Sequence, residues 1–251
     1  MSINKQKSND IAKLVLFDID HTLISNGGAG RLALYQALRE SLQVESQILE
    51  AANIRLSGKT DVQILNEFIT ACVPCCDGIS VNKVLDRYLQ ILPEYIENAS
   101  NTNKCFLHEG VSEILDLLDK DTNVALGLLT GNVEKGAYIK LEPFNLMRYF
   151  PIGAYGSDSA NRLELPAVAH KRAQEYYKAN WQPKDIVIIG DAENDVLCAK
   201  HYGATSLAVN TGTTTWQELS QHQPDYIFPT LKNTDQIIEA IMAHSPTSIM
   251  S

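Results

Sequence analysis

The stretch LVLFDIDHTL, residues 14–23, is an apolar run that ends in two aspartates on alternate positions, with a hydroxyl two places later. The apolar part predicts a buried strand, and the Thr22-Leu23 pair favours a turn directly after it. Two carboxylates at the end of a buried strand attract a divalent cation, because their like charges would otherwise force one of them to protonate. The alternative is that Asp18 and Asp20 only shape a turn after a core strand.

Two further apolar runs end in polar residues. VALGLLTGN, residues 124–132, places a hydroxyl and Gly-Asn after a predicted strand, and IVIIGDAEND, residues 186–195, places Asp191 and Asp195 after another. Taken alone, a hydroxyl in the position of Thr130 is more often a helix N-cap than a ligand. An open α/β sheet carries its functional residues at the carboxyl ends of its strands, so these polar residues are expected to share one edge of a sheet.

The three strand ends, taken in order, resemble the motifs of the haloacid dehalogenase superfamily of phosphatases. The resemblance implies Asp18 as the nucleophile that accepts a phosphoryl group and Asp20 as the general acid and base. It implies magnesium as the cofactor, held by Asp18, by the backbone carbonyl of Asp20 and by Asp191, with Asp195 behind Asp191 or holding a metal-bound water. Glu193 lies in the same loop and is expected to face solvent.

The second motif supplies the expected phosphate site. The resemblance implies that Thr130, together with the backbone N–H groups of Gly131 and Asn132, binds a phosphoryl oxygen. Backbone N–H groups at the start of a helix bind phosphate for the same reason that they need caps, because they lack partners within the helix.

Two positions depart from the usual pattern of the superfamily. Many relatives carry Lys-Pro before the last catalytic strand, and no Lys-Pro occurs between Thr130 and Asp191, which leaves Arg162 and Lys171 as candidates for the basic residue. Arg162 is favoured, since it lies just before a predicted helix, whereas a lysine inside a helix is usually solvated. His21 stands where glycine is commonest, and it either fits an ordinary turn or narrows the site.

About a hundred residues between the first two motifs show helical periodicity, which predicts an inserted helical cap domain. We expect the cap at residues 26–100 and an α/β core at 1–25 and 101–251, with a Rossmann-like parallel sheet and helices on both of its faces. This arrangement resembles the C1-capped branch that includes phosphoglycolate phosphatase and β-phosphoglucomutase. The cap loop at residues 57–61 carries Lys59, which either is solvated or faces the core site and contacts the leaving group of a substrate.

The composition limits the classes of partner. The chain has 251 residues, a formal net charge of −9 and a hydrophobic fraction of 45%, which predicts a soluble globular protein and disfavours binding to nucleic acid or to acidic membranes. No apolar run reaches the roughly 20 residues that span a bilayer. Residues 1–10 are polar and lack the apolar stretch of a signal peptide, so we expect a cytoplasmic protein, as a monomer or a homodimer. The cysteines complete no zinc pattern and are expected to be reduced.

The sequence favours a magnesium-dependent phosphatase that acts on a small phosphorylated metabolite through an aspartyl-phosphate intermediate. A phosphomutase of the same fold is the first alternative, because the motifs hardly separate transfer to water from transfer to a second sugar hydroxyl. A catalytically weak binding or regulatory protein is the second, and the complete set of acids disfavours it. Dehalogenase and phosphonate chemistry are disfavoured because those branches lack the second aspartate of the first motif.

Overall fold

The computed structural model describes residues 11–72 and 81–243. Among these residues, six parallel strands form one sheet in the order β5-β4-β1-β6-β7-β8. The strands are β1 Lys13–Phe17, β4 Val124–Leu129, β5 Gly153–Ala154, β6 Ile186–Gly190, β7 Thr205–Val209 and β8 Tyr226–Phe228. The helices that alternate with them are α5 Val111–Lys120, α6 Glu134–Leu141, α7 Leu165–Tyr177, α8 Glu193–Tyr202, α9 Trp216–Gln221 and α10 Thr234–Met242.

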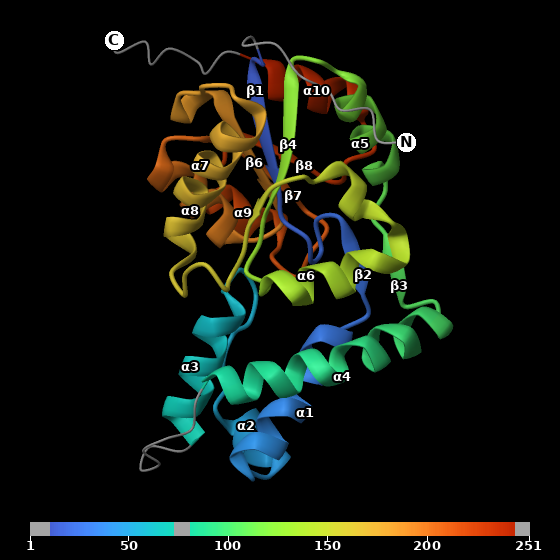
Figure 1. Cartoon of the computed structure of the whole chain (residues 1–251), viewed down its shortest axis with the longest axis vertical. Coiled ribbons are helices and arrows are strands. Elements are labelled where there is room, and N and C mark those ends of the chain that lie inside the picture. The colour runs from blue at the N-terminus through green and yellow to red at the C-terminus, as the bar shows by residue number, and fades with distance from the viewer. Residues whose placement is uncertain (1–10, 73–80, 244–251) are drawn as a thin grey trace.

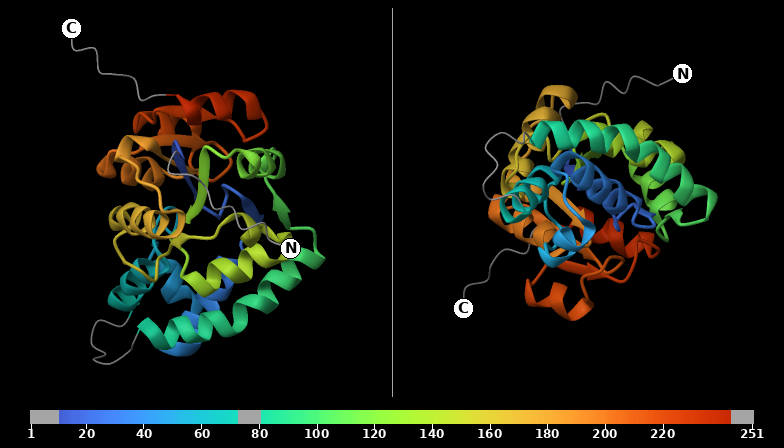
Figure 2. Two further views of the ribbon diagram at one scale, coloured as in Figure 1. Left: turned by 45° about the horizontal axis from the view of Figure 1, so that its top comes forward. Right: turned by 90° about the horizontal axis from the view of Figure 1, so that it is seen from below.

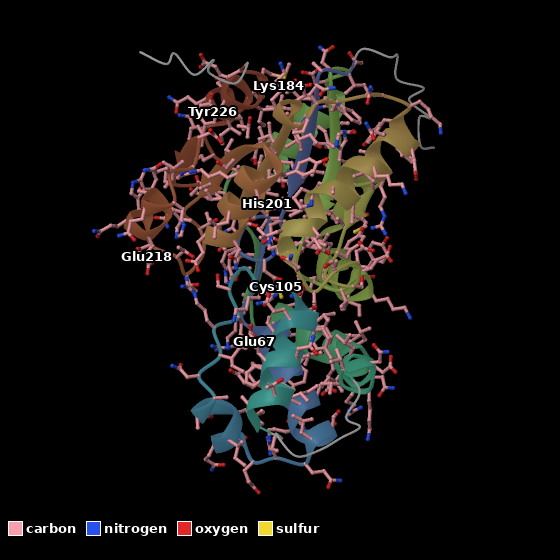
Figure 3. The ribbon with its side chains drawn as sticks, turned by 90° about the vertical axis from the view of Figure 1, so that its left-hand side faces the viewer. Glu67, Cys105, Lys184, His201, Glu218 and Tyr226 are labelled. Carbon is pink, nitrogen blue, oxygen red and sulfur yellow. The ribbon has the colours of Figure 1, made fainter. Side chains whose placement is uncertain are left out.

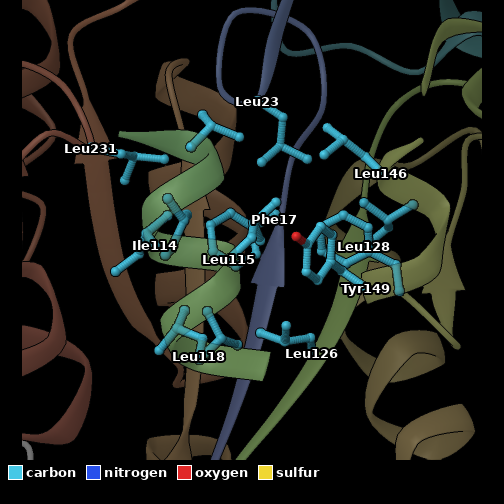
Figure 4. Close-up of a cluster of buried hydrophobic side chains, with 14 of the residues drawn as sticks. Phe17, Leu23, Ile114, Leu115, Leu118, Leu126, Leu128, Leu146, Tyr149 and Leu231 are labelled. Carbon is cyan, nitrogen blue, oxygen red and sulfur yellow. The ribbon is translucent and has the colours of Figure 1, made fainter. Parts of the chain in front are cut away.

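Alternate residues of β1 face two different layers of helices. Val15 and Phe17 belong to a buried cluster with side chains of α5 and α10, and Figure 4 shows Leu115 of α5 beside Phe17. Leu14 and Leu16 belong to a second cluster with side chains of α7 and α8. A strand covered on both faces has no solvent side, which explains why β1 and β6 are uninterrupted apolar runs. The Rossmann-like core with helices on both faces is thereby confirmed.

Four helices form a separate group between β1 and β4 in the chain. They are α1 Ala29–Leu42, α2 Ser46–Ala51, α3 Asp61–Cys72 and α4 Val81–Asn101. Their buried side chains, among them Leu38, Phe68, Tyr88 and Leu92, form a hydrophobic cluster of their own. Figures 1 and 2 show the four helices gathered at one end of the sheet.

A short antiparallel pair marks the passage of the chain into and out of the helical group. β2 Ile24–Asn26 leads into α1, and β3 Cys105–Leu107 follows α4. The helical cap expected from the sequence is therefore present, whereas its assignment as a domain of residues 26–100 stays a prediction.

The sequence patterns missed β8 and α9. β8 has three residues and α9 has six, and neither length allows a period of apolar residues to be recognised. Cys72, Cys105 and Cys198 are free thiols, and Cys75, Cys76 and residues 1–10 lie outside the described residues. No helix within residues 11–72 and 81–243 combines the length and the apolar character needed to cross a membrane.

Two glycines with the same backbone conformation precede helices in different surroundings. Gly110 precedes α5 with φ of +83°, and Gly28 precedes α1 with φ of +82°. A methyl group on Gly110 would overlap the backbone of Leu231 and Lys232, whereas a methyl group on Gly28 would meet open space. The pair therefore separates the strain of a left-handed residue from the effect of a steric collision.

We predict that Gly110→Ala lowers the free energy of unfolding by about 3 kcal/mol, because backbone atoms must move in addition to the left-handed strain. Gly28→Ala carries the strain alone and should cost only about 1 kcal/mol. Urea denaturation followed by circular dichroism measures both values. Equal losses of unfolding free energy in the two variants would show that the contact of a methyl group at position 110 with the neighbouring backbone does not affect stability.

Candidate active site

The central acidic cluster is assembled by two neighbouring strands. Asp18 follows β1 and Asp191 follows β6, and the Asp18 N–H donates to the carbonyl of Ile189 at 2.9 Å. Asp195 lies one turn further along the chain, in the first turn of α8. In the described part of the chain, carboxylate oxygens of these three buried aspartates lie within 4.8 Å of one another. Residues 173 positions apart in sequence are thus brought together, as the motif order predicts.

A single guanidinium enters this cluster. The Arg162 side chain is 6% exposed, its Nη2 lies 3.2 Å from Asp18 Oδ1, and the same nitrogen donates to Asp195 Oδ1. Although burial works against the charge, Asp195 and Asp18 hold the pKa of Arg162 above its ordinary value. Lys171 lies on α7 and is exposed. Of the two basic residues that the sequence left open, only Arg162 contacts the acids.

The charges in the cluster do not balance. Burial raises the pKa of Asp18 to about 7 against the opposing effect of Arg162, with Asp195 adding to the rise. Burial and the neighbouring Asp195 and Asp18 raise the pKa of Asp191 well above its ordinary value. Three carboxylates and one guanidinium leave a negative excess that a divalent cation would neutralise, and hard carboxylate oxygens are the ligands that Mg²⁺ prefers. The donor set therefore fits a magnesium ion.

The Asp20 carboxylate lies in a second, separate network. Its Oδ1 accepts from Asn26 Nδ2 at 2.6 Å, and its Oδ2 accepts from Asn132 Nδ2 at 2.8 Å and from Lys140 Nζ at 2.7 Å. Although burial acts in the opposite direction, the Lys140 ammonium and the hydrogen bonds from Lys140 and Asn132 hold the pKa of Asp20 below its ordinary value. The two aspartates of the first motif thus have opposite electrostatic surroundings.

The polar atoms of the loop after β4 are hydrogen-bonded within the protein. Thr130 is fully buried, and its Oγ1 accepts from the Asn132 backbone N–H at 3.3 Å and from Asn132 Nδ2 at 2.8 Å. The N-cap position of α6 belongs to Val133, whose N–H donates to the Asp61 carboxylate at 2.9 Å. Thr130 is therefore not the helix cap, which removes the alternative that the sequence left open.

The segment that begins α3 is hydrogen-bonded to this loop. The Asp61 N–H donates to the carbonyl of Gly131 at 2.8 Å, and Thr60 Oγ1 donates to the carbonyl of Ala160 at 2.8 Å. Thr60 is fully buried and Asp61 nearly so. These contacts therefore join the helical group to two loops of the core beside the site.

A cavity of about 580 Å³ lies at this junction. Its lining includes the polar residues Asp18, Asp20, Thr130, Asn132, Lys140, Arg162 and Asp191 and the apolar or aromatic residues Leu34, Tyr35, Ile54, Leu56, Ile64 and Tyr88. Lys59 also lines the cavity, which is the position expected of a residue that faces the core site. Its Nζ lies 2.5 Å from a carboxylate oxygen of Glu67. Figure 3 shows Glu67 in the helical group. The Lys59 charge is therefore already matched by an acid within that group.

The structure also contains site residues that the sequence patterns missed. Lys140 and Asp61 belong to none of the family motifs, and each is buried beside the acids of the site. Glu193 does not simply face solvent as expected, since its carboxylate lies 3.1 Å from Arg55 and its side chain is 22% exposed. The apolar spacing of α6 offered one signal for Lys140, because it stands next to Leu141 on the buried side of that helix.

His21 adopts a left-handed conformation, with φ of +61°. Its N–H donates to the carbonyl of Ile24 at 2.8 Å, and its carbonyl accepts from Thr211 Oγ1 at 2.5 Å. Glycine reaches this conformation without strain, which accounts physically for a position where glycine is frequent. His21 also lines the cavity, so the turn that it occupies lies at the site.

The chain is similar in sequence to known proteins. The profile of the haloacid dehalogenase-like hydrolases matches residues 15–209. A phosphoglycolate phosphatase of Mannheimia succiniciproducens is 24% identical over 88% of this chain and 95% of its own length. A phosphoglycolate phosphatase of Vibrio vulnificus is 23% identical over 92% of this chain and 96% of its own length.

Solved structures share the fold at lower identity. CbbY from Rhodobacter sphaeroides, determined in complex with phosphate, superimposes with a TM-score of 0.67 at 14% identity and covers 88% of this chain and 95% of its own. A hydrolase from Pseudomonas syringae gives a TM-score of 0.64 at 19% identity, over 92% of this chain and 99% of its own.

We predict that Asp61→Asn stabilises the protein at alkaline pH but not at acid pH. Burial raises the pKa of Asp61 to about 6, above the roughly 3.9 of an unfolded chain. The folded state therefore holds the proton more tightly, and stability is lost as pH rises from about 4 through about 6. The asparagine variant, which keeps an acceptor for Val133, should be about 2 kcal/mol more stable than the wild type at pH 8 and equal to it near pH 4.

Urea denaturation at several pH values measures this difference. Asp86→Asn, at an exposed position of α4, is the control and should follow the wild type at every pH. A pH-independent difference between Asp61→Asn and the wild type would contradict the argument.

Proposed function

Because the chain belongs to the haloacid dehalogenase-like hydrolase family and is a phosphatase, we propose that it hydrolyses a small phosphorylated metabolite through an aspartyl-phosphate on Asp18. One observation carries the proposal. Asp18, Asp191 and Asp195 lie together beside the cavity, and one guanidinium contacts two of them, so the negative excess there requires a divalent cation before a phosphate dianion can approach.

In the first half of the proposed reaction, an Asp18 carboxylate oxygen forms a bond to phosphorus and the bond from phosphorus to the leaving oxygen breaks. Asp20 takes up a proton as the negatively charged phosphate approaches and gives that proton to the leaving oxygen, so the alcohol departs neutral. In the second half, Asp20 takes a proton from water, the water oxygen attacks phosphorus, and the acyl-phosphate bond breaks to release inorganic phosphate and Asp18. Arg162 stabilises the charge that develops on the phosphoryl oxygens and holds Asp18 in place.

Mg²⁺ is the proposed cofactor. Asp18, Asp191 and the backbone carbonyl of Asp20 would hold it, and Asp195 would orient the loop around it through its hydrogen bond from the Ala192 N–H at 3.0 Å. When bound, the ion neutralises phosphate and carboxylate charge and so permits attack by an anionic nucleophile. Thr130 and the backbone N–H groups after β4 are the proposed partners of a phosphoryl oxygen.

The cavity supports a substrate with an organic part. The helical group contributes apolar and aromatic residues to the lining, such as Tyr35, Ile64 and Tyr88, together with the cations Arg31 and Arg55. We propose that this part of the lining contacts the leaving group, with Lys59 beside it. Release of inorganic phosphate separates hydrolysis from the phosphomutase alternative, in which the phosphoryl group would remain on an organic product.

The test of the function is the substitution Asp18→Asn, which keeps the shape of the side chain but removes the nucleophile. Release of inorganic phosphate from p-nitrophenyl phosphate should fall by roughly 10⁴-fold or more. Circular dichroism should show an unchanged fold. Near-normal turnover by a folded variant would exclude Asp18 as the nucleophile.

We also predict that the phosphatase activity depends on magnesium. EDTA should abolish activity, and added Mg²⁺ should restore it and raise the melting temperature, since a ligand that binds only the folded state stabilises it. Asp191→Ala should raise the Mg²⁺ concentration for half-maximal activity by about 10-fold to 100-fold. Glu193→Gln is the matched control, because Glu193 lies in the same loop and pairs with Arg55, and its magnesium requirement should not change.

We predict that changes at the two basic residues, Arg162 and Lys171, affect kcat to different extents. Arg162→Ala should lower kcat by about 10²-fold to 10³-fold, because a cation that contacts the reacting group stabilises transition-state charge. Arg162→Lys should recover part of the loss, since the charge returns without the planar fork. Lys171→Ala should have little effect. The reverse order of effects would assign the catalytic cation to Lys171.

A further inference from the structure

Lys140 is a charged side chain that no motif of the family resemblance explains. It lies near the end of α6, eight positions after Asn132, and is 5% exposed. Its ammonium donates to Asp20 Oδ2 at 2.7 Å and to Asn132 Oδ1 at 2.5 Å. One cation thus contacts two residues that lie at the ends of different strands, β1 and β4.

Packing does not explain a charge at this position. Removing an ammonium from water costs several kcal/mol, and an apolar residue of similar volume usually stabilises a buried site as well or better. Lys135 on the same helix is exposed, so α6 does not need a buried lysine for solubility. The charge of Lys140 is directed at Asp20 and Asn132.

The contact with Asn132 fixes the orientation of an amide group. Because Oδ1 accepts from the Lys140 ammonium, Nδ2 must face the other way, where it donates to Asp20 Oδ2 at 2.8 Å and to Thr130 Oγ1 at 2.8 Å. Without Lys140, Asn132 Oδ1 would lose this donor, and only the two hydrogen bonds of Nδ2 would hold the amide in its orientation. Loss of the Lys140 side chain would therefore remove one of the two donors on Asp20 Oδ2 and loosen the other.

We propose that Lys140 is a positioning residue for proton transfer to the leaving group. Through the ammonium and the Asn132 amide, it holds the Asp20 carboxylate in the one orientation from which a proton reaches the departing oxygen. This inference rests on the proposed function. Lys140 itself forms no bond to substrate and gives up no proton, and the proton that reaches the leaving oxygen is the one carried by Asp20.

Substrates with different leaving groups test the proposal. p-Nitrophenolate departs without a proton, whereas an alkoxide needs one, so general acid catalysis matters only for the alkyl phosphate. For Lys140→Met, kcat/KM on an alkyl phosphate such as glycerol 3-phosphate should fall by about 10²-fold, and kcat/KM on p-nitrophenyl phosphate by less than about 5-fold. Asp20→Asn should give the same selective loss, and the double variant should lose no more than Asp20→Asn alone.

The ratio of the two kcat/KM values comes from one preparation, so it does not depend on the fraction of protein that is folded. Lys140→Gln, which keeps one donor without the charge, provides a second variant, and Asn132→Ala breaks the same network from its other end. Both should shift the ratio in the same direction. Lys135→Met is the matched control on α6 and should leave both activities unchanged.

Equal losses on both substrates, or a relative gain on the alkyl phosphate, would overturn the assignment of Lys140 to proton transfer. Additive losses in the double variant would also overturn it, because Lys140 would then act independently of Asp20. Failure of the proposed function has a different signature, namely a wild-type protein that releases no phosphate from either ester or an Asp18→Asn variant that remains active.

Discussion

The excess of negative charge at the carboxyl ends of β1 and β6 is the constraint on which the site depends. The parallel pairing of these strands places Asp18 beside Asp191, and the short turn into α8 adds Asp195. Carboxylates at such distances repel each other in a buried place, and one guanidinium compensates only part of that repulsion. The fold tolerates the cost because the sheet and its two layers of helices fix the strand ends rigidly.

The two buried cations of the site contact different partners, and the chemistry of each side chain suits its position. Arg162 contacts Asp18 and Asp195 with a planar group whose separate N–H bonds can reach two carboxylates. Lys140 presents a compact ammonium to a carboxylate and an amide oxygen. The result is a site with two electrostatic compartments, one poor in positive charge around Asp18 and one rich in hydrogen-bond donors around Asp20.

Much of the fold was predictable because its signals are local. Uninterrupted apolar runs that end in Asp or Thr identify strands buried on both faces, and their order along the chain identifies the sheet edge that carries the site. Lys140 and Asp61 were not predictable in the same way, since each owes its role to partners brought close by tertiary structure. A lysine within a helix is usually solvated, and nothing near Lys140 in sequence shows that Asp20, 120 positions earlier, lies beside it.

The hydrogen bonds that join Thr60 and Asp61 to the carbonyls of Ala160 and Gly131 have a kinetic consequence. Each contributes about 1 kcal/mol net in water, so these contacts hold the start of α3 against the core only weakly. Movement of the helical group away from the core is a step that does not depend on the identity of the alcohol. Where that movement rather than the chemistry limits turnover, esters of very different reactivity converge on the same maximal rate.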